Sequence, residues 1–204
     1  MTYIFIIITI IISILAFYNR GLFYKLQFNP YSIYHRKEWH RFISYAFLHS
    51  DWSHLLINMF VLYSFGTSVE LYFKYFFADK AIPYYVLLYL ASIIFSVIYD
   101  FKRHKNDGFY NAVGASGAVS AVLFSSILFH PLGKLYLFFI PIGIPAVIFG
   151  GLYLIYSAYM AKKAKDNVGH NAHFWGAIFG FVFTIILKPE LFILFLEQIK
   201  KSII

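Results

Sequence analysis

A stretch of small residues, NAVGASGAVS from Asn111 to Ser120, interrupts a chain that is otherwise rich in Phe, Tyr, Ile and Leu. It places Ser116 in a Gly-X-Ser-Gly motif at the start of a strongly apolar segment. A serine hydroxyl is a weak nucleophile until a base accepts its proton. Small-residue clusters are also common where membrane helices pack closely. The motif by itself therefore favours packing, and a catalytic interpretation needs a base from elsewhere in the chain.

Polar side chains also stand at the start of two other apolar segments. HSDWSHLLIN places His54 and Asn58 four residues apart, so both project from one face of a helix. GHNAH places His173 at the start of the last long apolar segment. Because polar groups inside a membrane are unfavourable, they usually face the protein interior or a water-filled cavity. Each residue also has a structural explanation: Asn58 could bond a neighbouring helix, and His173 could be a core histidine bonded to a carbonyl.

Six apolar segments separated by short charged connections contain or border these residues. They cover roughly Tyr3–Tyr18, Trp52–Phe73, Ala81–Tyr99, Ala115–His130, Leu135–Met160 and Ala172–Leu187. The chain is 61% hydrophobic and only 13% charged, whereas a soluble domain carries about 25% charged residues. This composition predicts a multi-pass membrane protein. The first and fourth segments are short, because a helix needs about 20 residues to cross the hydrocarbon.

We therefore expect one all-α membrane domain over residues 1–204, with a bundle of six transmembrane helices as its core at about 38–187. The first connection, residues 19–51, is too polar to cross a membrane and rich in aromatic residues, which favour the membrane interface. It is predicted to form short elements at that level. The tail, residues 188–204, is predicted to extend the sixth helix or to lie at the interface.

Alternate helices of such a bundle run in the same direction. The second, fourth and sixth helices therefore begin at one end of the molecule, which puts His54, Ser116 and His173 at similar depth. On the sixth helix, Gly176 and Gly180 share a face with His173, and on the fourth helix Gly117 is the neighbour of Ser116. Small residues let two helices approach closely. If these faces meet, His173 lies against Ser116 as a candidate base.

Other classes of site are disfavoured. The chain has no cysteine, so it has neither a disulfide framework nor a thiolate metal site. His49, His54, His170 and His173 could suggest a metal, but the chain contains no H-E-x-x-H motif. We predict no metal and no cofactor. The net charge of +8 is spread over the connections, which indicates anchoring to lipid headgroups rather than nucleic-acid binding.

Four motifs occur in order along the chain. EWHRFISYAFLHSDWSHLLINM and FGTSVE carry Arg41, His54, Asn58, Gly66 and Glu70. GASG and AHFWGAIFG carry Gly114, Ser116, Gly117, His173, Gly176 and Gly180. Together, from about Glu38 to Phe181, these motifs resemble the rhomboid family of intramembrane serine proteases. The resemblance implies a six-helix rhomboid-like bundle with a long interfacial first loop.

The resemblance also implies hydrolysis of peptide bonds in or near transmembrane segments by a Ser–His dyad. Ser116 would be the nucleophile and His173 the general base, without a third acidic residue. The side chains of His54 and Asn58 would hold the oxyanion together with the Ser116 backbone N–H. The structural positions of the motifs would be Arg41, Gly66, Glu70, Gly114, Gly117, Gly176 and Gly180. Transmembrane protein substrates and the lipid bilayer would be the partners.

Two features depart from the family pattern. Some members carry, one turn after the nucleophile, an aromatic residue that packs on the histidine, whereas this chain has Ser120 there. The family usually places its active site on the exoplasmic side. Here eleven of the 17 Lys and Arg residues lie in the connections at the end expected to hold Ser116, and the positive-inside rule favours the opposite orientation.

Two alternatives to a protease remain. A non-catalytic relative that binds transmembrane clients would typically lack the serine or the histidine, and both are present here. A small transporter or channel would spread polar residues through its helices, whereas the candidates here gather at one end of three helices. The expected location is a bacterial-type cell membrane.

Overall fold

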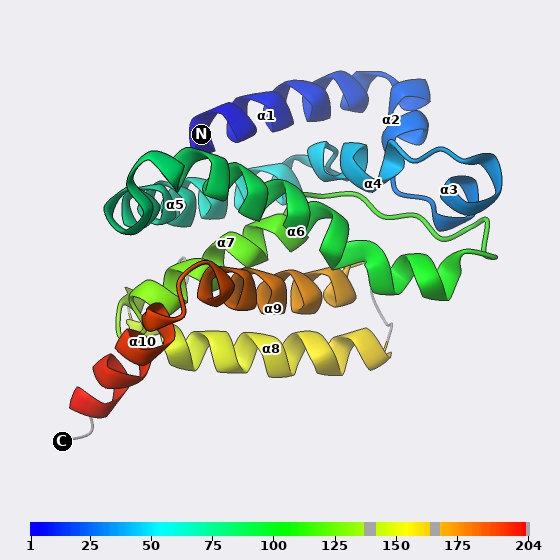
Figure 1. Cartoon of the computed structure of the whole chain (residues 1–204). Coiled ribbons are helices and arrows are strands. Elements are labelled where there is room, and N and C mark those ends of the chain that lie inside the picture. Colours follow the sequence, from blue (N-terminus) through cyan, green and yellow to red (C-terminus); the bar gives the residue numbers. More distant parts are fainter. Residues whose placement is uncertain (137–141, 164–167, 203–204) are drawn as a thin grey trace.

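The computed structural model describes residues 1–136, 142–163 and 168–202, and these residues are mostly helical (Figure 1). The α-helices are α1 (Thr2–Tyr18), α2 (Arg20–Leu26), α3 (Pro30–Arg36), α4 (Arg41–Ser44), α5 (Trp52–Phe77), α6 (Ala81–His104), α7 (Ser116–Phe129), α8 (Ala146–Lys163), α9 (His170–Leu187) and α10 (Glu190–Lys201). Short 3-10 turns, η1 (Tyr45–Phe47) and η2 (Ala78–Lys80), precede α5 and α6. Two short strands, β1 (Lys134–Leu135) and β2 (Ile144–Pro145), pair in antiparallel fashion.

Helix α7 is the centre of the molecule. Every residue from Gly117 to Phe129 is buried, and α5, α6 and α9 contact it from different sides. A helix that is apolar on all sides is typical of a buried core helix or of a membrane span. Helix α1 packs on α5, and α8 packs on α9 at the opposite side of the molecule (Figure 1). Helix α7 is therefore enclosed by the other helices of the molecule.

The fifth predicted segment, Leu135–Met160, is wrong in its first part. Helix α8 begins only at Ala146, and before it Leu135 pairs with Ile144 in the small β-ladder. Proline lacks an N–H and is tolerated at the start of a helix but not in its interior, so Pro145 marks the point where α8 can begin. Residues 137–141, which the prediction placed in a helix, lie outside the described part of the chain.

The other boundaries shift less. Helices α5 and α6 run to Phe77 and His104, beyond the predicted Phe73 and Tyr99, because a helix can continue past the apolar part of its sequence. The tail is not an extension of α9. It forms a separate helix, α10, after a break at Lys188 and Pro189.

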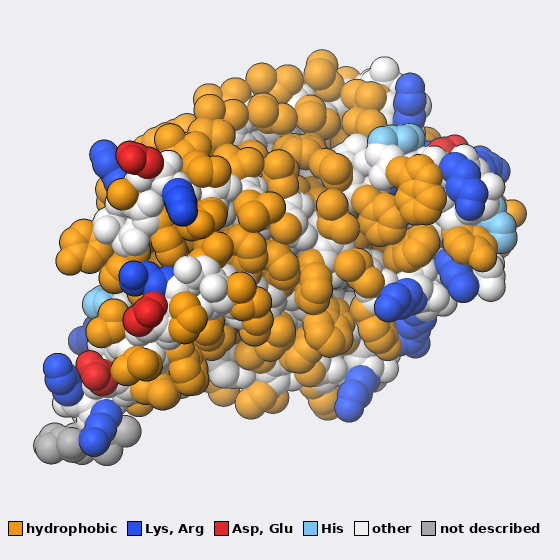
Figure 2. Space-filling model, in the orientation of Figure 1, with side chains coloured by type: hydrophobic (Ala, Val, Ile, Leu, Met, Phe, Trp, Pro, Cys, Tyr) orange, Lys and Arg blue, Asp and Glu red, His pale blue; other side chains and the backbone are white. Residues whose placement is uncertain are grey.

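Large apolar side chains cover much of the molecular surface (Figure 2). Ile7, Leu56, Leu71, Ile155 and Ile186 are each more than half exposed. Apolar surface of this extent on long helices suits contact with lipid rather than with water.

By length and composition, two of the described stretches could cross a membrane, Trp52–His104 and His170–Leu187, and the first of these contains both α5 and α6. Helices α1 and α7 are apolar but shorter. Six crossings, and the interfacial position of residues 19–51, remain predictions.

Candidate active site

Ser116 is the first residue of α7, and the segment before it is held by the first connection of the chain. Phe28 and Ala112 exchange two backbone hydrogen bonds, of 2.9 and 3.0 Å between N and O. The backbone N–H of Gly114 donates to the carbonyl oxygen of Tyr45 at 3.1 Å. Ser116 itself is partly exposed, whereas the rest of α7 is buried. The serine is therefore fixed in position while its side chain stays accessible.

His49 adds a second support to this segment. The Ala115 N–H points to His49 Nε2 at 3.5 Å, and His49 Nδ1 lies 3.0 Å from the Ser13 hydroxyl. Because that hydroxyl donates to the Phe47 carbonyl at 2.9 Å, we assign the ring proton of His49 to Nδ1. Burial, reinforced by the nearby His54, lowers the pKa of His49 to about 3. The ring is therefore neutral. The sequence placed this histidine among the polar residues near the start of the second helix and suggested a possible metal ligand, but it missed this contact.

The first turn of α5 carries His54. Asp51 caps the helix by accepting the His54 backbone N–H at 2.8 Å, and the hydrogen bonds it accepts from His54 and Ser50 lower the pKa of its carboxyl. The ring Nδ1 lies 3.1 Å from the Ser50 hydroxyl. The ring also packs on Gly114, two residues before the candidate nucleophile: a Cβ built there would lie 2.8 Å from the ring. Gly114 has φ +122°, which favours glycine.

Asn58 lies one turn further along α5 and is almost completely buried. Its side-chain amide donates to the His54 carbonyl at 2.9 Å. A primary amide has two N–H donors, so this bond leaves a second donor for a ligand. The structure brings His54 to the segment before Ser116. It places Asn58 one turn after His54 on the same helix.

The faces of small residues on α7 and α9 meet, as the sequence predicted. A Cβ built on Gly176 would lie 2.1 Å from the Gly117 carbonyl oxygen, and one built on Gly180 would lie 2.0 Å from that of Ala121. At the first turn of α7, a Cβ on Gly117 would lie 3.3 Å from the Ala172 carbonyl oxygen. The register of these contacts sets His173, the residue after Ala172, beside the first turn of α7.

Two other rings lie next to His173. The Tyr153 ring of α8 is nearly parallel to the imidazole, with 6.2 Å between centroids and 25° between planes. His170 lies on α9 at 5.9 Å, edge to face. The hydroxyl of Tyr153 forms a hydrogen bond of 2.6 Å with the Ser120 hydroxyl. Ser120 stands at the α7 position where some family members carry an aromatic residue. Here its hydroxyl bonds to Tyr153, an aromatic residue of α8. Nothing in the spacing of GLYLIYSAYM indicated Tyr153.

Three of the motif residues lie in other parts of the molecule. Arg41 is buried, pairs with Glu38 and donates from one nitrogen to the carbonyls of Tyr24 and Gln27, at 2.8 Å each. A Cβ built on Gly66 would clash with the side chains of Thr2 and Tyr85 at the crossing of α1, α5 and α6. Glu70 pairs with the amino group of Met1. These contacts fit structural roles.

The N-terminal end of α7 gives this site a favourable electrostatic character. The first N–H groups of a helix have no partner within the helix, and the helix dipole places partial positive charge there. Ser116 begins α7, and the His54 ring lies against the turn that leads into it. A negative charge that develops on an oxygen at this point would be stabilised.

Comparison with known proteins identifies the family of this chain. The family model described as the Rhomboid domain matches residues 36–190. The "RHOMBOID-like protein 12, mitochondrial" of Arabidopsis thaliana is 32% identical over 155 residues. The alignment covers 68% of this chain and 43% of that relative, so the chain spans less than half of the relative's length.

Proposed function

This chain belongs to the rhomboid family, whose members are integral membrane proteins, and we propose that it is an intramembrane serine endopeptidase. Its substrates are membrane proteins, cleaved in or near their transmembrane segments. The close contact of α7 and α9 at Gly117 and Gly176 is the observation that carries this proposal. Without that contact, Ser116 and His173 would be unrelated residues of two helices.

In the proposed reaction His173 takes the proton from the Ser116 hydroxyl as its oxygen attacks the carbonyl carbon of the substrate. His173 then gives this proton to the leaving amine, and the peptide C–N bond breaks. An ester between Ser116 and the acyl half of the substrate remains. Water hydrolyses the ester with His173 as the base, which restores the serine hydroxyl. No metal and no cofactor enters this scheme.

The oxyanion of each tetrahedral intermediate would lie at the N-terminal end of α7. The proposed donors are the Ser116 N–H and the side chains of His54 and Asn58. The contact of His54 with Gly114 supports its part in this set. Loss of one such donor typically lowers the rate by roughly 10²–10³.

We further propose a multi-pass protein of a bacterial-type cell membrane. The Arabidopsis relative is named as mitochondrial, which makes an organelle membrane the alternative. Imaging of a tagged copy in its own host would distinguish the two.

The proposal is tested with a serine-directed fluorophosphonate and a panel of tagged single-span substrates in liposomes. We expect the wild type to be labelled and to cleave at least one substrate. Ser116→Ala and His173→Ala are expected to lose both signals, because one removes the nucleophile and the other its base.

Ser64→Ala is the matched control, since the Ser64 hydroxyl donates to the Phe60 carbonyl of its own helix at 2.8 Å. Labelling that survives in Ser116→Ala would contradict the assignment. A folded wild type that captures helical substrates but neither reacts nor cleaves would favour the non-catalytic, client-binding relative instead.

A further inference from the structure

We propose that the hydroxyl pair of Ser120 and Tyr153 holds an aromatic ring against His173, and that Tyr153 is a positioning residue for the catalytic base. This inference rests on the proposed function and extends it to α8. Tyr153 does not touch the reacting atoms in this proposal. It acts through the orientation of the imidazole.

The hydroxyl pair fixes where the ring can be. Ser120 lies one turn after Ser116 on α7, and its side chain is almost completely buried, with 4% of the residue exposed. The two hydroxyl oxygens are 2.6 Å apart. Because an unpartnered hydroxyl in an apolar surrounding is unfavourable, each group restrains the other. A direct link thus joins the helix of the nucleophile to α8.

Packing fixes how the Tyr153 ring is turned. Phe124 of α7 lies 5.7 Å from it and Phe149 of α8 lies 5.9 Å from it, measured between ring centroids. With its tip bonded to Ser120 and its sides packed, the ring lies nearly parallel to the His173 imidazole, 6.2 Å away between centroids and at a plane angle of 25°. Residues of both α7 and α8 therefore set the orientation of the Tyr153 ring.

Such a neighbour restricts the imidazole. A histidine side chain on a helix surface turns about two bonds, and only a narrow set of angles directs its nitrogen toward a serine on the next helix. Holding a catalytic group in its reactive geometry lowers the entropic part of the barrier. The electron-rich face of a tyrosine also attracts a cation, and the imidazole becomes cationic when it takes the serine proton. Both effects act on the chemical step.

The test separates this role from simple packing between α7 and α8. Tyr153→Phe and Ser120→Ala each remove one hydroxyl and leave the ring, whereas Tyr153→Leu removes the ring. Tyr159→Leu is the control: Tyr159 lies on the same helix, is 53% exposed and contacts Lys163. Steady-state cleavage gives kcat and KM, and thermal unfolding in detergent gives Tm for each variant.

We expect Tyr153→Phe and Ser120→Ala each to lower kcat by about five-fold, the value of one ordinary hydrogen bond. The double variant is expected to be no slower than either single one, because both remove the same bond. Tyr153→Leu is expected to lower kcat by at least ten-fold and to change KM by less than two-fold. Tyr159→Leu is expected to match the wild type.

A wild-type kcat in Tyr153→Leu would overturn the proposal. So would a fall in kcat that only follows a fall in Tm, or additive losses from the two hydroxyl variants. NMR of histidine-labelled protein gives a readout independent of turnover. The His173 ring signals, identified through His173→Gln, should shift strongly in Tyr153→Leu and by a smaller amount in Tyr153→Phe. Unchanged signals in Tyr153→Leu contradict the contact, whereas an inactive wild type with shifted signals contradicts only the proteolytic function.

Discussion

At the scale of single residues, His49 shows how the fold decides the charge of a side chain. Its ring is buried between the Ser13 hydroxyl and the backbone N–H of Ala115, which lowers its pKa from 6.5 to about 3. Between those two values the unfolded chain binds a proton at His49 and the folded chain does not. Stability therefore rises with pH across this window and is lost as the pH falls through it.

We expect the folded protein in detergent to become less stable as the pH is lowered from 6.5 toward 4. His49 contributes up to about 1.4 kcal/mol per pH unit to this slope. His49→Gln, which keeps a donor and an acceptor but cannot be protonated, is expected to flatten the curve of Tm against pH. His35→Gln, at an exposed position, is the control and should keep the wild-type slope. An equal slope in the two variants would contradict the role of His49.

At the scale of the elements, the sequence predicted contacts that depend on local spacing and missed those that depend on distant partners. Glycines three and seven residues after His173 mark a narrow helix face wherever the helix lies, so the contact of α9 with α7 was predictable. Tyr153 is one of several aromatic residues in α8. Only the packing of α8 against α7 and α9 shows that it is the one beside His173. The β-ladder was missed because Leu135 and Ile144, which pair in it, are as apolar as the residues of a helix.

A methyl group at Gly176 tests the contact of α7 and α9. Gly176→Ala places a Cβ where the Gly117 carbonyl lies, and overpacking of this kind typically destabilises by about 1–3 kcal/mol. We expect a lower Tm and a loss of cleavage, because the helices must separate beside Ser116. Gly151→Ala on α8 is the matched control, since a Cβ there meets nothing within 4 Å. If both variants cleave at the wild-type rate, the close contact is not needed for activity.

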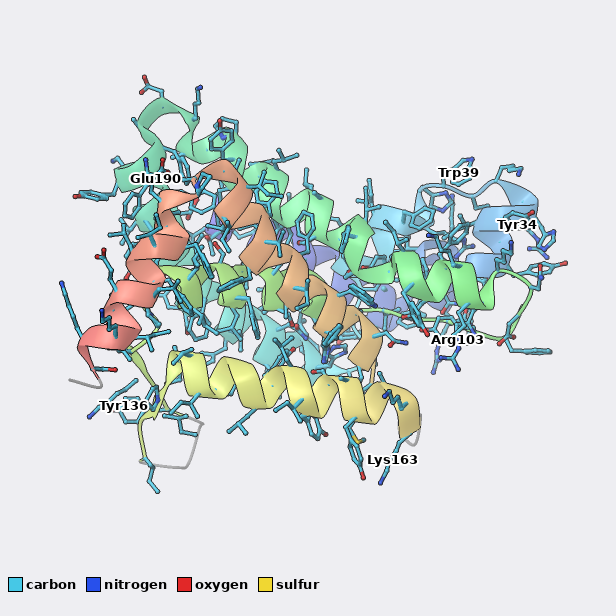
Figure 3. The ribbon with its side chains drawn as sticks, turned by 60° about the horizontal axis from the view of Figure 1, so that its bottom comes forward. Tyr34, Trp39, Arg103, Tyr136, Lys163 and Glu190 are labelled. Atoms are coloured by element: carbon cyan, nitrogen blue, oxygen red, sulfur yellow. The ribbon has the colours of Figure 1, made fainter. Side chains whose placement is uncertain are left out.

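At the scale of the whole molecule, charge is distributed unevenly between the two ends. Figure 3 shows Tyr34, Trp39, Arg103 and Lys163 toward the end at which α9 begins, and Tyr136 and Glu190 toward the other. The basic residues of the described chain at the first end are Arg20, Lys25, Arg36, Lys37, Arg41, Lys102, Arg103, Lys105, Lys162 and Lys163. Lys165, also expected there, lies outside the described residues. This distribution favours an orientation with the candidate site toward the cytoplasm.

The orientation is measurable because the chain has no cysteine of its own. Asn106→Cys and Ser202→Cys introduce single thiols at exposed positions of opposite ends. With a maleimide that does not cross membranes, we expect Asn106→Cys to react in inverted vesicles and Ser202→Cys in intact cells. The reverse pattern would show that the basic connections face outward and that the usual family orientation holds.

The length of α7 has a consequence for how far a substrate helix would have to unwind before a peptide bond is cut. Its 14 residues span about 21 Å, whereas the hydrocarbon of a bilayer is about 30 Å thick. If the far end of α7 lies near one surface of the hydrocarbon, Ser116 lies several ångströms below the other. Each added carbon in the lipid tails would then sink the serine deeper. The thickness of the host membrane, and not the protein alone, would set how far a substrate helix must unwind to be cleaved.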